Sequence, residues 1–222
     1  DILSRLTQAQ TVYNGQTVTI GYAYDAVGNR TSITDALSNV TGYSYDEMNR
    51  VETITNADEN EITYQYDLAG NKTAEVRPTG TWRFEYDQLN RLTISRNPDN
   101  NVISKNIYDE NGNVIKKIDG NGYDSAATDN ARYGTVYTYN FANMLTSVSL
   151  PEGGTTQYEY NVFGDKVKVI DPLMHETSYY YDDAGDLLSV TDALNNQTSY
   201  TYDLAGNMTS TTDAKTNTVH YA

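Results

Sequence analysis

The chain has 222 residues with a formal net charge of −15, 21 tyrosines, three phenylalanines, one tryptophan and no cysteine. An acidic surface repels nucleic-acid phosphates and anionic lipid headgroups, which argues against either as a partner of the whole chain. No apolar run approaches the ~20 residues that a membrane-spanning helix needs. Because tyrosine is the dominant large side chain, we expect a partly phenolic core in which each buried hydroxyl has a hydrogen-bond partner.

A motif of the form Tyr-x-Tyr-Asp recurs along nearly the whole chain. Successive copies lie 21 residues apart in most cases, with single intervals of 20, 22 and 31. Such a period predicts a repeat architecture in which each unit packs against its neighbours. The second aromatic residues of the motif, called the anchor tyrosines, are Tyr24, Tyr45, Tyr66, Tyr86, Tyr108, Tyr139, Tyr160, Tyr181 and Tyr202.

The segments on both sides of an anchor tyrosine are typical of short strands. Residues 39–45 and 197–202 place β-branched and aromatic side chains on one face at a period of two. Residues 50–55 follow the turn and are again rich in β-branched side chains. Their apolar residues Val51 and Ile54 are three apart, so we infer that a bulge near the turn shifts the register.

Two columns of the alignment predict the turn that follows each anchor. The first column is always Asp or Asn, as at Asp67, and we expect its side chain to accept from the amides two and three residues on. The column three residues later is always Gly or Asn, as at Gly70, which indicates a left-handed backbone in a bulged hairpin. A second turn closes each unit, as in 191–196. No segment has a helical period, so the chain is predicted to be all-β.

The unit at 198–207, Thr-Ser-Tyr-Thr-Tyr-Asp-Leu-Ala-Gly-Asn, is preceded by Thr-Asp-Ala-Leu-Asn-Asn. It resembles the Rhs or YD repeat of bacterial polymorphic toxins, insecticidal toxin-complex proteins, wall-associated proteins and teneurins. The resemblance covers residues from about 17 to 222. It implies a β-sheet strip that coils into a hollow shell around a toxic cargo domain, or a large extracellular scaffold. It also implies that the protein is secreted or displayed on the bacterial cell surface.

The spacing itself favours a curled strip. Nine hairpins give eighteen strands, and open twisted sheets rarely exceed about ten strands without curling. Equivalent rings on adjacent repeats are about 9.6 Å apart, so they must interleave with side chains of the return strand. We therefore predict one array of tandem antiparallel hairpins over residues 1–222, forming a long curled or spiral sheet within a longer chain. The rival arrangement, a propeller with two repeats per blade, conflicts with the consecutive Gly164, Gly185 and Gly206.

Few residues suggest chemistry. An insertion at about 119–134 begins Asp119-Gly-Asn-Gly-Tyr-Asp-Ser, which is similar to a calcium loop, but Asn130 stands where the bidentate Glu would be. We favour a Gly/Asp-rich excursion from a hairpin and leave calcium binding open. His175 and His220 are far apart, and zinc would need more ligands. We predict no catalytic, cofactor-binding or metal site, no cofactor and no enzyme activity.

Two functions fit such an array. The first is a shell segment that encloses or carries a toxin or effector polypeptide. The second is an extracellular adhesin or filament scaffold whose tyrosine rows bind glycans or partner proteins. The expected partners are neighbouring repeats of the same long chain, an enclosed cargo polypeptide and glycans. Because Tyr221 opens a tenth unit, we also expect an uncapped sheet edge that recruits other copies end to end.

Overall fold

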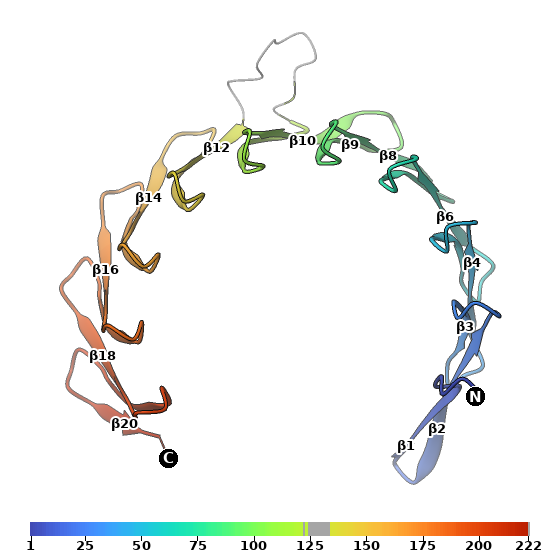
Figure 1. The fold of residues 1–222 in the computed structure, drawn as a ribbon, viewed down its shortest axis with the longest axis horizontal. Coiled ribbons are helices and arrows are strands. Elements are labelled where there is room, and N and C mark those ends of the chain that lie inside the picture. The colour runs from blue at the N-terminus through green and yellow to red at the C-terminus, as the bar shows by residue number, and fades with distance from the viewer. Residues whose placement is uncertain (122, 124–133, 222) are drawn as a thin grey trace. The chain divides into compact units, whose positions relative to one another are not determined.

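The structure is a computed structural model that describes residues 1–121, 123 and 134–221 (Figure 1). Every regular element in this part of the chain is a β-strand, which confirms the predicted all-β fold. None of the described residues belongs to a helix that could cross a membrane. The insertion at about 119–134 lies mostly outside the described residues, so the predicted Gly/Asp-rich excursion stays a prediction and calcium binding stays open.

The contacts divide the chain into two compact units, Asp1–Ser104 and Lys105–Ala222. The strands of the first unit are β1 (Gln8–Tyr13), β2 (Gln16–Tyr24), β3 (Arg30–Thr34), β4 (Val40–Tyr45), β5 (Val51–Thr55), β6 (Glu61–Tyr66), β7 (Lys72–Arg77), β8 (Gly80–Tyr86) and β9 (Leu92–Arg96). Strand β10 (Val102–Tyr108) spans the division. The strands of the second unit are β11 (Val114–Asp119), β12 (Gly134–Tyr139), β13 (Leu145–Ser149), β14 (Thr155–Tyr160), β15 (Lys166–Ile170), β16 (Glu176–Tyr181), β17 (Leu187–Thr191), β18 (Gln197–Tyr202), β19 (Met208–Thr212) and β20 (Thr218–His220).

Consecutive strands pair antiparallel from β1 to β9 and from β11 to β20. The anchor tyrosines are the last residues of the even-numbered strands from β2 to β18. Successive turns therefore alternate between two edges of the strip, and the strip of each unit bends as strands are added (Figure 1). Tandem hairpins in a curving sheet are thus confirmed within the units.

The structure has more strands than the eighteen predicted. An extra hairpin joins β1 to β2 through Asn14 and Gly15, both with positive φ (48° and 76°). An Asn-Gly pair between two strands is a strong signal for a two-residue hairpin turn, and the repeat alignment overlooked it. The single interval of 20 residues also has a local cause, because Arg77 pairs directly with Gly80 across another two-residue turn.

The predicted register shift is present in every hairpin that follows an anchor tyrosine in β2, β4, β6, β8, β12, β14, β16 and β18. In β4 and β5, Ser44 pairs with Thr53 whereas the next residue, Tyr45, pairs with Val51. The return strand therefore carries one extra residue, a β-bulge. This bulge brings residues three apart onto one face, which explains the spacing that strict alternation forbids.

The two faces of the sheet differ in chemistry. On one face Tyr43 pairs with Ile54, which in turn pairs with Ile62, so aliphatic side chains separate the tyrosines of adjacent repeats as predicted. On the other face small hydroxyl side chains pair, as Thr53 does with Thr63. The buried hydrophobic residues in the described part of the chain are Ala74, Val102 and Ile118.

Candidate functional site

The turn after each anchor tyrosine has one backbone geometry. In the turn that starts at Asp46, the amide of Asn49 donates to the carbonyl of Asp46 (2.9 Å), and the amide of Asp46 donates to the carbonyl of Arg50 (2.9 Å). This is a tight turn followed by a left-handed residue. The predicted dihedral requirement is confirmed, because φ is positive at Gly28, Asn49, Gly70, Asn90, Gly112, Asn143, Gly164, Gly185 and Gly206.

The side-chain acceptor pattern differs in one respect from the prediction. The Asp46 carboxylate accepts from the amides of Met48 and Arg50, two and four residues on, both at 2.9 Å. The amide three residues on is already bonded to the main-chain carbonyl of Asp46, so the side chain reaches past it. At Asp25 the carboxylate accepts from all three amides, two, three and four residues on.

The second turn has the same geometry in the repeats where it starts at residues 35, 56, 97, 150, 171, 192 and 213, which the sequence reasoning did not predict. The amide of Asn195 donates to the carbonyl of Asp192 (3.0 Å), and the amide of Asp192 donates to the carbonyl of Asn196 (3.0 Å). In most of these turns the signal was present in the sequence as Asp or Asn four residues before Asn, whereas Gly154 and His175 stand in the place of that Asn in two of them. It was obscured because the left-handed position is held there by residues as different as Ser38, Glu59, Met174 and Thr216.

The anchor tyrosines bind each repeat to the one before it. The hydroxyl of Tyr66 donates to the carbonyl of Val51 (2.8 Å), at the start of the preceding return strand. Burial raises the pKa of the Tyr66 phenol, which keeps the hydroxyl a donor. The expected hydroxyl partners are thus confirmed. The equivalent pairs are Tyr24 with Leu6, Tyr45 with Arg30, Tyr86 with Lys72, Tyr139 with Val114, Tyr160 with Leu145, Tyr181 with Lys166, and Tyr202 with Leu187.

Asparagine side chains link some adjacent turns. The Asn29 amide donates to the Asp25 carboxylate of its own turn (2.9 Å) and to Oδ1 of Asn49 in the next turn (2.8 Å). Asn71 and Asn113 make the same two kinds of bond, to Asn90 and Asn143 in the following turns. Where Gly occupies the left-handed position, this link is lost. The alternation of Gly and Asn in the first repeats therefore reflects two ways of joining neighbouring turns.

The turn carboxylates are held in their charged form by local donors. The side-chain amide of Asn71, followed by its backbone amide, lowers the pKa of the Asp67 carboxyl against the opposing effect of desolvation. The same cause acts at Asp203 through Asn207. These aspartates are turn formers with satisfied oxygens, as the sequence reasoning proposed.

One charged group interrupts the aliphatic row of the tyrosine face. Glu75 lies between Tyr64 and Trp82 in the register and is only 8% exposed. Its carboxylate pairs with Lys72 (2.7 Å) and with Arg77. Burial opposes ionisation, but these two partners outweigh it and lower the pKa of the Glu75 carboxyl. Lys72 also lies 5.0 Å from the ring centroids of Tyr64 and Phe84.

The two histidines are not brought together. His175 Nδ1 lies 2.8 Å from Asp171 Oδ2 in an exposed turn, and His220 ends β20. In the described part of the chain, no group of three or more His, Cys, Asp or Glu side chains is arranged to hold a metal ion.

These contacts define the class of protein: a tandem β-hairpin array whose recurring residues join each repeat to the next. The family model RHS Repeat matches residues 24–61 and 181–218. Each match spans two anchor tyrosines with the turns and strands between them. These two segments match the Rhs repeat, as the sequence resemblance indicated. No curated protein matches the sequence.

Solved structures of Tc toxin components have the same fold. The match to the crystal structure of TcdB2-TccC3-TEV covers 92% of this chain and 13% of that chain, with a TM-score of 0.62 and 18% identity. The match to the crystal structure of TcdB2-TccC3 covers 96% of this chain and 16% of that chain, with a TM-score of 0.57 and 18% identity. The match to the Photorhabdus luminescens Tc holotoxin pore with mutated TccC3 covers 96% of this chain and 15% of that chain, with a TM-score of 0.56 and 18% identity. The chain spans less than one fifth of the length of these matches, and at this identity the likeness shows the fold alone.

Proposed function

We propose that the chain is a non-catalytic wall segment that, within a longer secreted or surface-displayed protein, encloses or carries a toxin or effector polypeptide. The observation that carries this proposal is the tyrosine-to-carbonyl bond, which recurs from repeat to repeat at 2.8–3.2 Å. Such bonds use the most distinctive side chain of the repeat to join neighbours. The shared fold with Tc toxin components supports the same role.

A catalytic role has no support from the recurring residues. The aspartates are explained by the turns, as at Asp46, and the tyrosines by their carbonyl partners, as at Tyr66. A residue that makes the same bond to the backbone from one repeat to the next has a structural role. We therefore propose that the wall acts through containment and needs no cofactor.

A glycan-binding role for the tyrosine rows is less favoured. Stacking on sugars needs exposed aromatic faces, whereas the anchor rings are half-buried and their hydroxyls are bonded. Tyr13 and Tyr180 are exposed (70% and 66%), but they lie in different units and form no row.

The test is protease protection in the complete parent protein. A wall that encloses a polypeptide should shield it from protease until the wall is loosened. The variant Tyr66→Phe with Tyr160→Phe removes two of the inter-repeat bonds, and we expect the enclosed polypeptide to be cleaved faster. The matched control is Tyr13→Phe with Tyr180→Phe, which should leave cleavage unchanged. If the polypeptide is cleaved as rapidly in the native protein as in the Tyr66→Phe with Tyr160→Phe variant, containment is contradicted.

A further inference from the structure

An arginine side chain crosses from one turn to the next in the first unit. Nε and Nη2 of Arg50 both lie 2.7 Å from Oδ2 of Asp46 in its own turn. Nη1 donates to the carbonyl of Asp67 (3.3 Å), and the guanidinium carbon lies 4.4 Å from the ring centroid of Tyr66. A carboxylate, an aromatic face and a carbonyl thus surround one guanidinium group.

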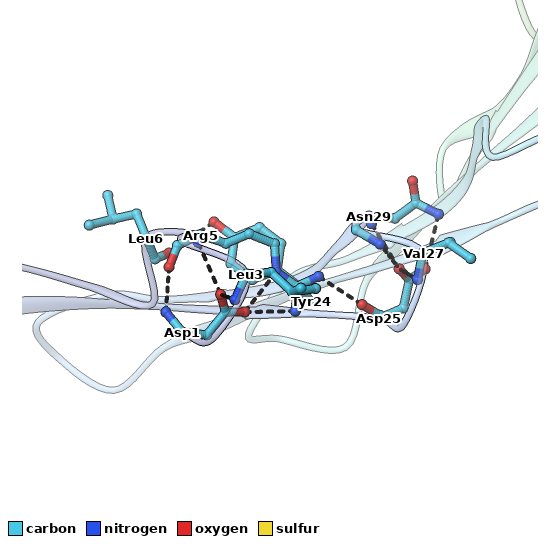
Figure 2. A network of polar contacts seen from close by, with 9 residues as sticks. Asp1, Leu3, Arg5, Leu6, Tyr24, Asp25, Val27 and Asn29 are labelled. Atoms are coloured by element: carbon cyan, nitrogen blue, oxygen red, sulfur yellow. Dashed lines mark hydrogen bonds and ion pairs between the residues drawn. The ribbon is translucent and has the colours of Figure 1, made fainter.

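The same arrangement occurs at the start of the chain (Figure 2). Arg5 contacts the Asp1 carboxylate (2.7 Å), donates to the carbonyl of Asp25 (2.9 Å) and lies 4.8 Å from the ring centroid of Tyr24. Asp1 accepts from the amide four residues on, and Ser4 takes the left-handed position, as in the repeat turns. Two independent copies show that a turn aspartate with the following anchor tyrosine is a guanidinium-binding arrangement.

The second unit repeats the surroundings of this arrangement without the arginine. Asp182 corresponds to Asp46, Tyr202 to Tyr66 and Asp203 to Asp67, whereas Asp186 stands at the position of Arg50. A groove of about 1090 Å³ lies there. Its lining combines these four residues with apolar surface from Leu188, Tyr200 and Leu204, and the rest is Ala184, Thr201, Ala205 and Gly206.

No arginine belongs to the groove lining, because Asp186 stands at the position that Arg50 has in the first unit. The charges in the groove lining are the carboxylates of Asp182, Asp186 and Asp203. Burial and then the charges of Asp186, Tyr200 and Asp182 raise the pKa of the Tyr202 phenol.

We propose that this groove binds the guanidinium group of an arginine side chain supplied by a partner polypeptide. The Asp182 carboxylate would take the place that Asp46 has for Arg50, and the Tyr202 ring and the Asp203 carbonyl would complete the set. Asp186 adds a second carboxylate. The planar fork of arginine matches a carboxylate and a ring face together, which the point charge of lysine does not. The apolar lining suits the methylene stem of the same side chain.

The first experiment titrates the 222-residue chain with acetyl-Gly-Arg-Gly-amide and follows backbone amide chemical shifts at Gly206 and Asp186. We expect saturable shifts there, and an affinity about tenfold weaker for the citrulline analogue, which keeps the shape but loses the charge. Asp186→Asn should weaken binding, whereas the adjacent Asp183→Asn makes the same charge change outside the lining and should not. Equal binding of citrulline and arginine peptides, equal loss in both variants, or no saturable shift would overturn the proposal.

The second experiment supplies the arginine from the chain itself. Asp186→Arg recreates the arrangement of Asp46, Arg50 and Tyr66, so we expect a higher Tm and loss of peptide binding. Asp183→Arg is the matched control, because it makes an identical change in net charge next to the groove. A rise in Tm for Asp186→Arg that exceeds the control, with contacts between the new guanidinium and the Tyr202 ring in nuclear Overhauser spectra, would support the site. Equal behaviour of the two variants would refute it.

Discussion

The turns at the anchor edge of the first unit and those near the end of the second unit share a backbone but differ in side chains. In the first unit, Asn29 bonds to Asn49 in the next turn, and Arg50 crosses to the carbonyl of Asp67. At the equivalent positions of the second unit stand Asp165 and Asp186, and in the described structure neither carboxylate has a hydrogen bond to the following turn. Turn formation and the joining of turns are therefore separate properties, set by different columns of the repeat.

The largest expected effect concerns the left-handed position, which both regions share. Gly70→Val should lower the free energy of unfolding by about 1–3 kcal/mol, because a β-branched residue is strained at a φ of 92°. Gly206→Val should cost a similar amount, because its φ of 81° is also left-handed and a Cβ at either position makes no close contact. Chemical denaturation measures both, with Gly70→Asn as the tolerated control. Equal stability of the Val and Asn variants at position 70 would contradict the turn assignment.

A second prediction concerns Glu75, which has no counterpart in the second unit's pairings of Tyr158 with Val169 and Tyr179 with Val190. Glu75→Gln should cost about 1–2 kcal/mol, less than for a fully buried pair because Lys72 and Arg77 remain partly exposed.

The effect of Glu75 should depend on pH. Its folded pKa lies below the ordinary value of 4.5, so its contribution is full above that value and is lost as the pH falls through the lower folded pKa. Unfolding free energies of the native chain and Glu75→Gln should therefore converge in acid. Glu47→Gln, at an exposed turn position, is the control that should show no such convergence. A difference that persists unchanged to pH 2 would show that charge is not the cause.

The contrast between the regions also indicates what sequence could reveal. The period, the anchor tyrosines and the left-handed column were predictable, because each expresses a rule of one strand or one turn. The second turn was not recognised as the same structure. Its left-handed position is held by Met174 and Thr216 in two repeats, and these residue types do not indicate a positive φ as Asn195 does. The links from Asn29 to Asn49 and from Arg50 to Tyr66 were beyond reach, because they join residues about one repeat apart whose proximity depends on the register of the bulged hairpins.

A third prediction uses this hidden turn. Thr216 is β-branched and has a φ of 66°, whereas Asn195 at the same place in the preceding turn of that edge has a φ of 63°. Thr216→Asn should raise the unfolding free energy by about 0.5–1 kcal/mol, because asparagine tolerates this conformation better. The reverse change, Asn195→Thr, should lower it by a similar amount. Thermal unfolding of both variants compares them directly, and changes of the same sign would show that backbone strain is not what differs.

The smallest effect isolates the joining of turns. Asn49→Gly keeps the left-handed backbone but removes the acceptor of the Asn29 amide, an exposed bond of 2.8 Å, so we expect a loss of about 0.5 kcal/mol. Asn195→Gly is the matched control, because it makes the same change at nearly the same φ in a turn where no side-chain bond to a neighbouring turn is present among the described contacts. Both changes to Gly increase the backbone freedom of the unfolded chain equally. The difference between their losses of unfolding free energy therefore measures the bond from Asn29 to Asn49. A double-mutant cycle with Asn29→Ala then measures the coupling, which should account for most of that difference. A coupling near zero would mean that the alternation of Gly and Asn serves the backbone alone, and that neighbouring turns are held together only by their strands and their anchor tyrosines.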